Sequence, residues 1–259
     1  MITRRLVQHL REQNWTAITI EFVLLVLGVF LGIQAANWNE AATDRRSAAR
    51  YMDDIADDIR ADIEELSRTR VSALTRIAAS THILREAGHP ELAAEFAISD
   101  SSADDIFNGI ERFAIPEQAP LTEFQRHRLW PLVVGFYVYD TNRSAFDALV
   151  SSGKIDLLDD REVLGKLREY YYLVNALDRT QTRTILPMRN HFIELGIARG
   201  LSPEGPVDED LLVRKVGDDP ALAASIAASR EYAALHLYLA QLLDGKAHEL
   251  QQLLKRQAQ

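Results

Sequence analysis

A long apolar run near the N-terminus, followed by apolar residues at helical spacing, is the main pattern of the chain. Phe22–Ile33 is wholly apolar, and Glu21 and Gln34 flank it within the wider segment 15–38. About 24 residues at 1.5 Å each span roughly 35 Å, enough for the ~30 Å hydrocarbon layer of a bilayer. Trp15 and Trp38 stand at its ends, where indole side chains favour the headgroup level. The pattern predicts one membrane-spanning helix with a tryptophan anchor at each interface.

A cleaved signal peptide is the competing interpretation of this run, because its apolar core is also short. Signal peptidases cut after a small-x-small sequence, and Ile33–Ala36 is a poor match to that pattern. We therefore expect an uncleaved anchor.

Small and polar residues lie on one face of the predicted membrane helix. At 100° per residue this stripe consists of Glu21, Leu25, Gly28, Gly32, Ala35 and Asn39. Gly28 and Gly32 form a G-x-x-x-G, which lets two helix backbones approach closely in lipid. A carboxylate facing acyl chains is costly, so Glu21 should face protein, water or the headgroups. We expect a helix–helix contact; the alternative is that Glu21 reaches an interface and the glycines face lipid.

The orientation in the membrane depends on nearly balanced arginines. Three precede the span and three follow it closely: Arg4, Arg5, Arg11, Arg45, Arg46 and Arg50. Short N-terminal tails with arginines usually stay in the cytoplasm, so we expect the N-terminus inside and the large domain outside.

The rest of the chain predicts an all-α protein, in which the membrane helix continues into an antiparallel bundle of long helices. Residues 1–14 form a basic interfacial tail, 39–259 the bundle domain, and 88–121 an irregular segment within it. The periodicity predicts helices over about 41–87, 122–153, 161–199, 208–216 and 220–256.

Glycine and proline mark the ends of these helices. Gly88 and Gly153 should terminate the first two, Pro187 should kink the third, and Pro220 should open the last after an aspartate cap. The run VVGFYVY has β propensity, but it is isolated, and we interpret it as helix.

A carboxylate cluster occupies the start of the first soluble helix: Asp53, Asp54, Asp57, Asp58, Asp62, Glu64 and Glu65. Such a cluster can collect calcium or magnesium, but it lacks the glycine turn of a calcium loop. The carboxylates fall between the apolar positions, so we expect a solvated acidic face.

Composition removes several classes of function. The chain has no cysteine, which excludes disulfides, thiol catalysis and iron–sulfur clusters. Its net charge is −9, which does not favour nucleic acid as a partner.

Two separated segments carry a resemblance. Ala35-Ala36-Asn37-Trp38-Asn39-Glu40 closes the membrane helix, and Ser144–Leu158 followed by Tyr170-Tyr171 contains a small–aromatic–x–x–Leu–x–Ser–Ser–Gly helix end. Both blocks resemble those of a family of bacterial single-span membrane proteins of unknown function. The resemblance covers about a quarter of the chain and implies an architecture, but no activity or catalytic residue. Together with the orientation expected from the arginines, it leads us to expect a bacterial inner-membrane protein with a periplasmic domain.

The sequence contains only partial matches to known catalytic motifs. Ser151-x-x-Lys154 matches a penicillin-binding motif, but there the motif opens a helix, whereas Gly153 closes one here. His191 and Glu194 have ligand spacing without the second copy that a metal-carboxylate bundle needs. We therefore expect no enzyme activity, no metal and no cofactor.

Aromatic residues of the second and third soluble helices offer the one candidate ligand pocket. Tyr139 and Tyr171, with the charges of Arg143 and Arg168 nearby, can line such a space, although packing is the commoner role of buried tyrosine.

Two functions remain. The first is a membrane-anchored structural or interaction protein, an oligomer or an accessory subunit of a larger membrane complex, with the bilayer and itself or other subunits as partners. The second is an extracytoplasmic ligand-binding or sensory bundle. We favour the first, because residues 1–14 are too short to signal unaided.

Overall fold

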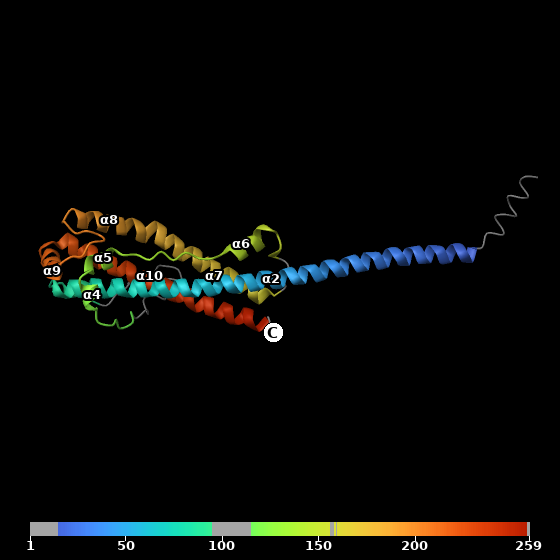
Figure 1. Ribbon diagram of the computed structural model, residues 1–259, viewed down its shortest axis with the longest axis horizontal. Coiled ribbons are helices and arrows are strands. Elements are labelled where there is room, and N and C mark those ends of the chain that lie inside the picture. Colours follow the sequence, from blue (N-terminus) through green and yellow to red (C-terminus); the bar gives the residue numbers. More distant parts are fainter. Residues whose placement is uncertain (1–14, 95–114, 156–157, 159, 258–259) are drawn as a thin grey trace, which may run out of the picture. The chain divides into compact units, whose positions relative to one another are not determined.

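The computed structural model describes residues 15–94, 115–155, 158 and 160–257, with the side chains of those between residues 19 and 256 (Figure 1). Every regular element within these ranges is helical, so the predicted all-α class is confirmed. The chain divides into two compact units, Met1–Tyr51 and Met52–Gln259. The predicted basic tail 1–14 and most of the predicted irregular segment lie outside the described residues.

One helix, α2, runs from Trp15 to Glu86 over 72 residues and contains the division between the two units. This confirms the expected continuity between the apolar segment and the first soluble helix. No glycine or proline interrupts the chain between Gly32 and Gly88, so nothing in the sequence breaks the ladder of backbone hydrogen bonds.

Three helix ends share one glycine-based geometry. Gly88, Gly153 and Gly200 have φ of 86°, 69° and 75°, a region that costs residues with a Cβ atom. The residue after each glycine donates its N–H to a carbonyl five residues earlier, at 2.8, 3.2 and 2.9 Å. This is the Schellman motif, and the predicted termination at Gly88 and Gly153 is confirmed.

Three long helical segments form the core of the Met52–Gln259 unit. They are the part of α2 from Met52, the consecutive elements α7 (Arg161–Thr180), η4 (Gln181–Ile185) and α8 (Leu186–Ile197), and α10 (Pro220–Gln257). Figure 1 shows them lying lengthwise beside one another. Two aspartates cap their N-termini: Asp160 accepts from Glu162 N at 2.7 Å, and Asp219 accepts from Ala221 N at 2.9 Å, which confirms the aspartate cap predicted before Pro220.

The directions of the three segments follow from their contacts. Arg70 of α2 pairs with Asp244 at 2.9 Å, whereas Arg230 donates to Thr81 at 2.9 Å, so α10 runs antiparallel to α2. Lys166 pairs with Glu249 and Gln181 contacts His236, so α10 also runs antiparallel to α7. The α2 and α7–α8 segments consequently run in the same direction.

Each segment buries a seam at alternating steps of four and three residues, which is the heptad spacing of packed helices. Every position of the α2 seam is buried: Ile55, Ile59, Asp62, Leu66, Thr69, Ala73, Arg76, Ser80 and Ile83. The α10 seam follows the same rule: Leu222, Ile226, Ser229, Ala233, His236, Ala240, Leu243, Ala247, Leu250 and Leu254.

The seam of α7 contains one extra residue. It runs Val163, Leu167, Tyr170, Val174, Leu177 and Gln181 at heptad steps, and the next buried position is Ile185 instead of 184. The π-helical turn η4 supplies this insertion, and Pro187 lies in the first turn of α8 directly after it. A π turn loosens the backbone where a proline ring would meet the carbonyl of residue i−4. The kink predicted at Pro187 stays a prediction; the structure shows a π turn directly before the α8 helix that contains this proline.

The predicted helix over 122–153 is wrong in its middle. The structure has α4 (Glu123–Arg126), α5 (Leu129–Val134) and α6 (Ser144–Ser151), with non-helical backbone over 135–143. The break begins at Gly135, whose backbone is extended, with ψ of 141°. A Cβ atom at Gly135 would lie 2.7 Å from the carbonyl oxygen of Pro131, so this close turn requires glycine.

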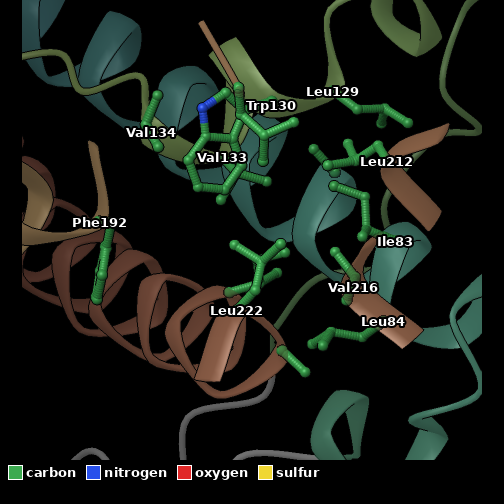
Figure 2. Close-up of a cluster of buried hydrophobic side chains, with 14 of the residues drawn as sticks. Ile83, Leu84, Leu129, Trp130, Val133, Val134, Phe192, Leu212, Val216 and Leu222 are labelled. Atoms are coloured by element: carbon green, nitrogen blue, oxygen red, sulfur yellow. The ribbon is translucent and has the colours of Figure 1, made fainter. Parts of the chain in front are cut away.

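Trp130 of α5 is the centre of the apolar core at the α9 end of the bundle. Side chains of α2, α5, α8, α9 (Glu209–Asp218) and α10 surround it, and Figure 2 shows this cluster: Ile83, Leu84, Leu129, Val133, Val134, Phe192, Leu212, Val216 and Leu222. The indole ring lies against Gly196, where a Cβ atom would be 2.1 Å from Cζ2. The short 3-10 helix η1 (Pro90–Ala93) contributes Ala93 to the same core.

We predict that Gly196→Ala lowers the free energy of unfolding by about 1–3 kcal/mol, because the added methyl group overlaps the fully buried indole ring. Gly165→Ala is the matched control: this glycine is exposed on α7, and its Cβ atom meets nothing within 4 Å. The control should raise stability by about 0.5–1 kcal/mol, the ordinary helix preference for alanine. Urea unfolding measures both, and equal effects at the two sites would contradict the packing of Trp130.

Candidate functional site

The residues of the predicted membrane-contact stripe are all exposed. Glu21, Leu25, Gly28, Gly32, Ala35 and Asn39 lie on α2 among residues 19–40, every one of which is exposed. A Cβ atom at Gly28 or Gly32 would meet nothing within 4 Å. Trp38 is 81% exposed, and Trp15 begins the helix, with its side chain outside the described part. The contact that the stripe would make stays a prediction.

The apolar part of α2 is long and hydrophobic enough to cross a membrane. Its best 18-residue window has a mean hydropathy of 2.1, and none of that window is buried within the described protein. Its large side chains, such as Phe22 at 67% and Leu31 at 63% exposed, therefore cover no core of this chain. A contiguous exposed apolar surface of this kind is typical of a lipid or partner contact.

The predicted solvated acidic face is wrong at two positions. Asp58 and Asp62 are 6% and 0% exposed, whereas Asp53, Asp54 and Asp57 face solvent as expected. Both buried carboxylates face the chain segment 135–145. They accept hydrogen bonds from backbone N–H groups of this segment that have no partner within a helix or a sheet.

Asp62 is the centre of a buried hydrogen-bond cluster. Its Oδ2 accepts from the hydroxyls of Tyr170 at 2.5 Å and Thr141 at 2.8 Å, and its Oδ1 accepts from the backbone N–H of Asn142 at 2.8 Å. The hydroxyl of Tyr139 lies 3.4 Å from that of Tyr170. The cluster thus joins α2, α7 and the segment 135–143.

Asp58 lies on α2 one helical turn before Asp62. Its Oδ2 accepts from the backbone N–H of Ala145 at 3.0 Å, in the first turn of α6. The N-cap residue of α6, Arg143, makes no side-chain cap of its own. A carboxylate from a neighbouring helix therefore takes the place of a local cap and complements the positive end of the helix.

The side-chain amide of Gln181 makes hydrogen bonds to both the backbone N–H and the backbone carbonyl of Tyr139. Its Oε1 accepts from Tyr139 N at 2.8 Å and its Nε2 donates to Tyr139 O at 3.0 Å, as a paired strand would. The same Oε1 lies 3.0 Å from His236 Nε2. Because Oε1 has only acceptor capacity, His236 must carry its proton on Nε2.

Burial sets the protonation of these groups. It raises the pKa of Asp62 above 3.8, although hydrogen bonds from Tyr170, Asn142 and Thr141 oppose the shift. Burial also raises the pKa of Tyr170 far above its usual range, so its hydroxyl remains a donor. Burial, with the charge of Arg76, lowers the pKa of His236 to about 3, which keeps the imidazole neutral.

The predicted pocket residues are brought together only in part. Tyr139 and Tyr171 are both buried beside Tyr170, and the guanidinium of Arg143 lies 5.4 Å from the centre of the Tyr171 ring. Arg168 is exposed on α7. The hydroxyls of Tyr139 and Tyr170 are turned to Asp62, so these tyrosines act in packing and hydrogen bonding inside the bundle.

The sequence carried a signal for the residues that were missed. Asp62, Thr69, Arg76 and Ser80 occupy heptad positions of α2 between apolar residues, and Gln181, Ser229 and His236 do so on the other two segments. Polar residues at seam positions indicate a polar layer in a bundle core, where they fix register at some cost in stability. Extending the apolar periodicity of α2 through position 62 would have found them.

Within the described residues, no group of three or more His, Asp or Glu side chains is arranged to hold a metal ion, and His191 and Glu194 are exposed. Comparisons with protein-family models, with curated proteins and with solved structures find no match for this chain. The hydrogen bonds of Asp58, Asp62 and Gln181 hold the backbone of 139–145 to α2 and η4.

We predict that Asp62→Asn changes the pH dependence of stability. Since the folded protein holds the Asp62 proton more tightly than the unfolded chain, the contribution of this group falls as pH rises from about 4 through the raised pKa. The difference in unfolding free energy, variant minus wild type, should therefore increase with pH across that window. His236 contributes equally to both proteins and cancels.

Asp57→Asn is the control for this measurement, because Asp57 is exposed and pairs only with Arg60, at 2.7 Å among the described contacts. Its substitution changes only a solvent-exposed ion pair, so the comparison tests whether the pH effect requires a buried carboxylate. Urea titrations between pH 4 and pH 8 decide the matter, and a flat curve for Asp62→Asn would contradict the burial of this carboxylate.

Proposed function

We propose that this chain is a membrane-anchored helical interaction protein, which joins copies of itself or other membrane subunits through its apolar helix. The observation that carries the proposal is the complete exposure of residues 19–40, an apolar surface that the rest of the described chain leaves uncovered. In water this surface would be strongly unfavourable, at about 25 cal/mol for each Å² of apolar area.

A soluble core helix and a cleaved signal sequence fit this apolar segment less well than a membrane span does. The core helix of a water-soluble protein buries its apolar face, whereas none of the apolar window is buried here. A cleaved signal sequence would end at a recognisable site, and helix α2 continues through Ile33–Ala36 to Glu86. A span of residues 15–38 with Trp15 and Trp38 at the headgroup levels accounts for both observations.

A helix–helix contact on the stripe is the interaction that we propose. The open space around Gly28 and Gly32 leaves their backbone available to a second helix. Small residues at this spacing allow close backbone packing in lipid, where association depends on van der Waals contact and interhelical hydrogen bonds. Glu21 lies on the same stripe, and a contact there would remove its carboxylate from the acyl chains.

The resemblance in the sequence supports a bacterial membrane, and the arginines of the short N-terminal tail support an orientation with the Met52–Gln259 unit on the periplasmic side of the inner membrane. The ligand-binding alternative has less support at the tyrosine cluster, because Asp62 already accepts three hydrogen bonds from the protein itself. A ligand at that place would have to replace them.

We expect the double substitution Gly28→Leu with Gly32→Leu to reduce the assembly state of the full chain, because two added side chains separate the helices at the stripe. Native mass spectrometry in mild detergent measures this. Val26→Leu with Phe30→Leu, on the opposite face at 100° per residue, is the matched control and should leave the mass unchanged. An unchanged mass for the glycine variant would rule out the stripe as the contact.

The absence of cysteine makes the orientation directly measurable. A cysteine at the exposed position Glu162 should react with a membrane-impermeant maleimide on intact spheroplasts, whereas one at Thr3 should react only after lysis. The reverse pattern would place the bundle in the cytoplasm.

A further inference from the structure

Arg76 is a buried cation without a complete set of partners. Its side chain is 4% exposed at a seam position of α2, and neither Nε nor Nη2 has a hydrogen-bond partner among the described residues. One side of the guanidinium faces the ring of Phe136, with 5.2 Å between Cζ and the ring centre. Burying a charge without hydrogen bonds is among the costliest arrangements in a protein core.

Arg76 lines an internal cavity at the junction of α2, α5, α8 and α10. The cavity has a volume of about 10 Å³. Its other lining residues are Val133, Val134, Ile185, Arg189, Phe192, Ser229 and Tyr232. This space accommodates one water molecule or one monatomic ion of similar size. None of the residues that line it is an acid.

The cavity is electrostatically positive. Arg189 adds a second guanidinium, and burial together with the charge of Arg189 lowers the pKa of Arg76 to about 10, so both side chains are cations at neutral pH. His236 is neutral and its Nε2 donates to Gln181. The buried carboxylates Asp58 and Asp62 are bound to the segment 141–145 and lie more than three turns along α2 from Arg76.

The backbone carbonyls beside the cavity do not accept hydrogen bonds from Nε or Nη2 of Arg76. The carbonyl of Val134 accepts from Arg189 Nε at 2.7 Å, and that of Val133 accepts from the Ser229 hydroxyl at 2.8 Å. These bonds orient Arg189 and Ser229 at the cavity wall, and they leave Nε and Nη2 of Arg76 without an acceptor.

We propose that the cavity is a binding site for one monatomic anion, a halide such as chloride, held by Arg76 and Arg189 in the bundle core. A halide matches the volume, offers acceptor capacity in every direction and neutralises one of two neighbouring buried charges. A water molecule fits the same space but carries no charge. The site lies in the Met52–Gln259 unit and is independent of the membrane contact.

Thermal unfolding of the full chain in detergent tests the site, with chloride replaced stepwise by gluconate at constant ionic strength. Gluconate is too large for the cavity, so the melting temperature should rise with chloride concentration, by roughly 3–6 °C for each tenfold increase above the dissociation constant. Bromide should replace chloride with a similar effect, and crystals grown in bromide should show one anomalous peak beside Arg76.

Arg76→Met should abolish the chloride dependence while the protein still folds, because the substitution removes a buried charge and keeps most of the side-chain volume. Arg230→Met is the matched control: Arg230 is also a buried arginine facing α2, but it donates to Thr81 and does not line the cavity. Its variant should retain the full dependence. Equal melting temperatures of wild type in chloride and gluconate, or a dependence that survives in Arg76→Met, would overturn the proposal and leave a water molecule in the cavity.

Discussion

The α2 helix has an exposed apolar part and a part that packs in the bundle, and the rest of the structure depends on this difference. From residue 19 to residue 40 every side chain is exposed and most are apolar, a surface typical of a lipid or partner contact. From Met52 the same helix carries a heptad seam that two other segments cover. A helix satisfies its own backbone hydrogen bonds in either environment, which is why one element can serve both.

The bundle combines apolar layers with polar ones, and the polar layers restrict how the segments can align. Asp62 accepts from α7 and from 141–142 together, and Gln181 binds both backbone groups of Tyr139. Sliding one helix by a turn would leave these buried groups without partners, at about 1–3 kcal/mol for each neutral group. The apolar contacts alone, many of them alanine and leucine, tolerate such a shift far better. The polar cluster thus provides register, and the apolar seam provides most of the stability.

Sequence reasoning predicted those parts that local rules control. The all-α class, the continuity of α2, the glycine ends at 88 and 153 and the aspartate caps depend on helical spacing and on terminal residues that act within a few positions. It failed over 135–143, where the backbone takes its partners from Asp62 and Gln181, which are 42 residues or more away in sequence. It also placed Asp58 and Asp62 in solvent, since their partners were hidden by the same error. The membrane contact and the orientation depend on lipid or partner molecules, and the family resemblance depends on other sequences. All three remain proposals.

The proposed function requires that residues 15–38 lie within a bilayer, and alkaline carbonate extraction of membranes from cells that express the full chain tests this placement. The wild-type protein should remain in the membrane pellet, whereas Leu25→Arg with Val29→Arg should move it to the supernatant, because each arginine near the middle of the span costs roughly 3 kcal/mol or more. Release of the wild-type protein by carbonate would show that the exposed apolar surface is covered by something other than lipid, and would contradict the membrane anchor.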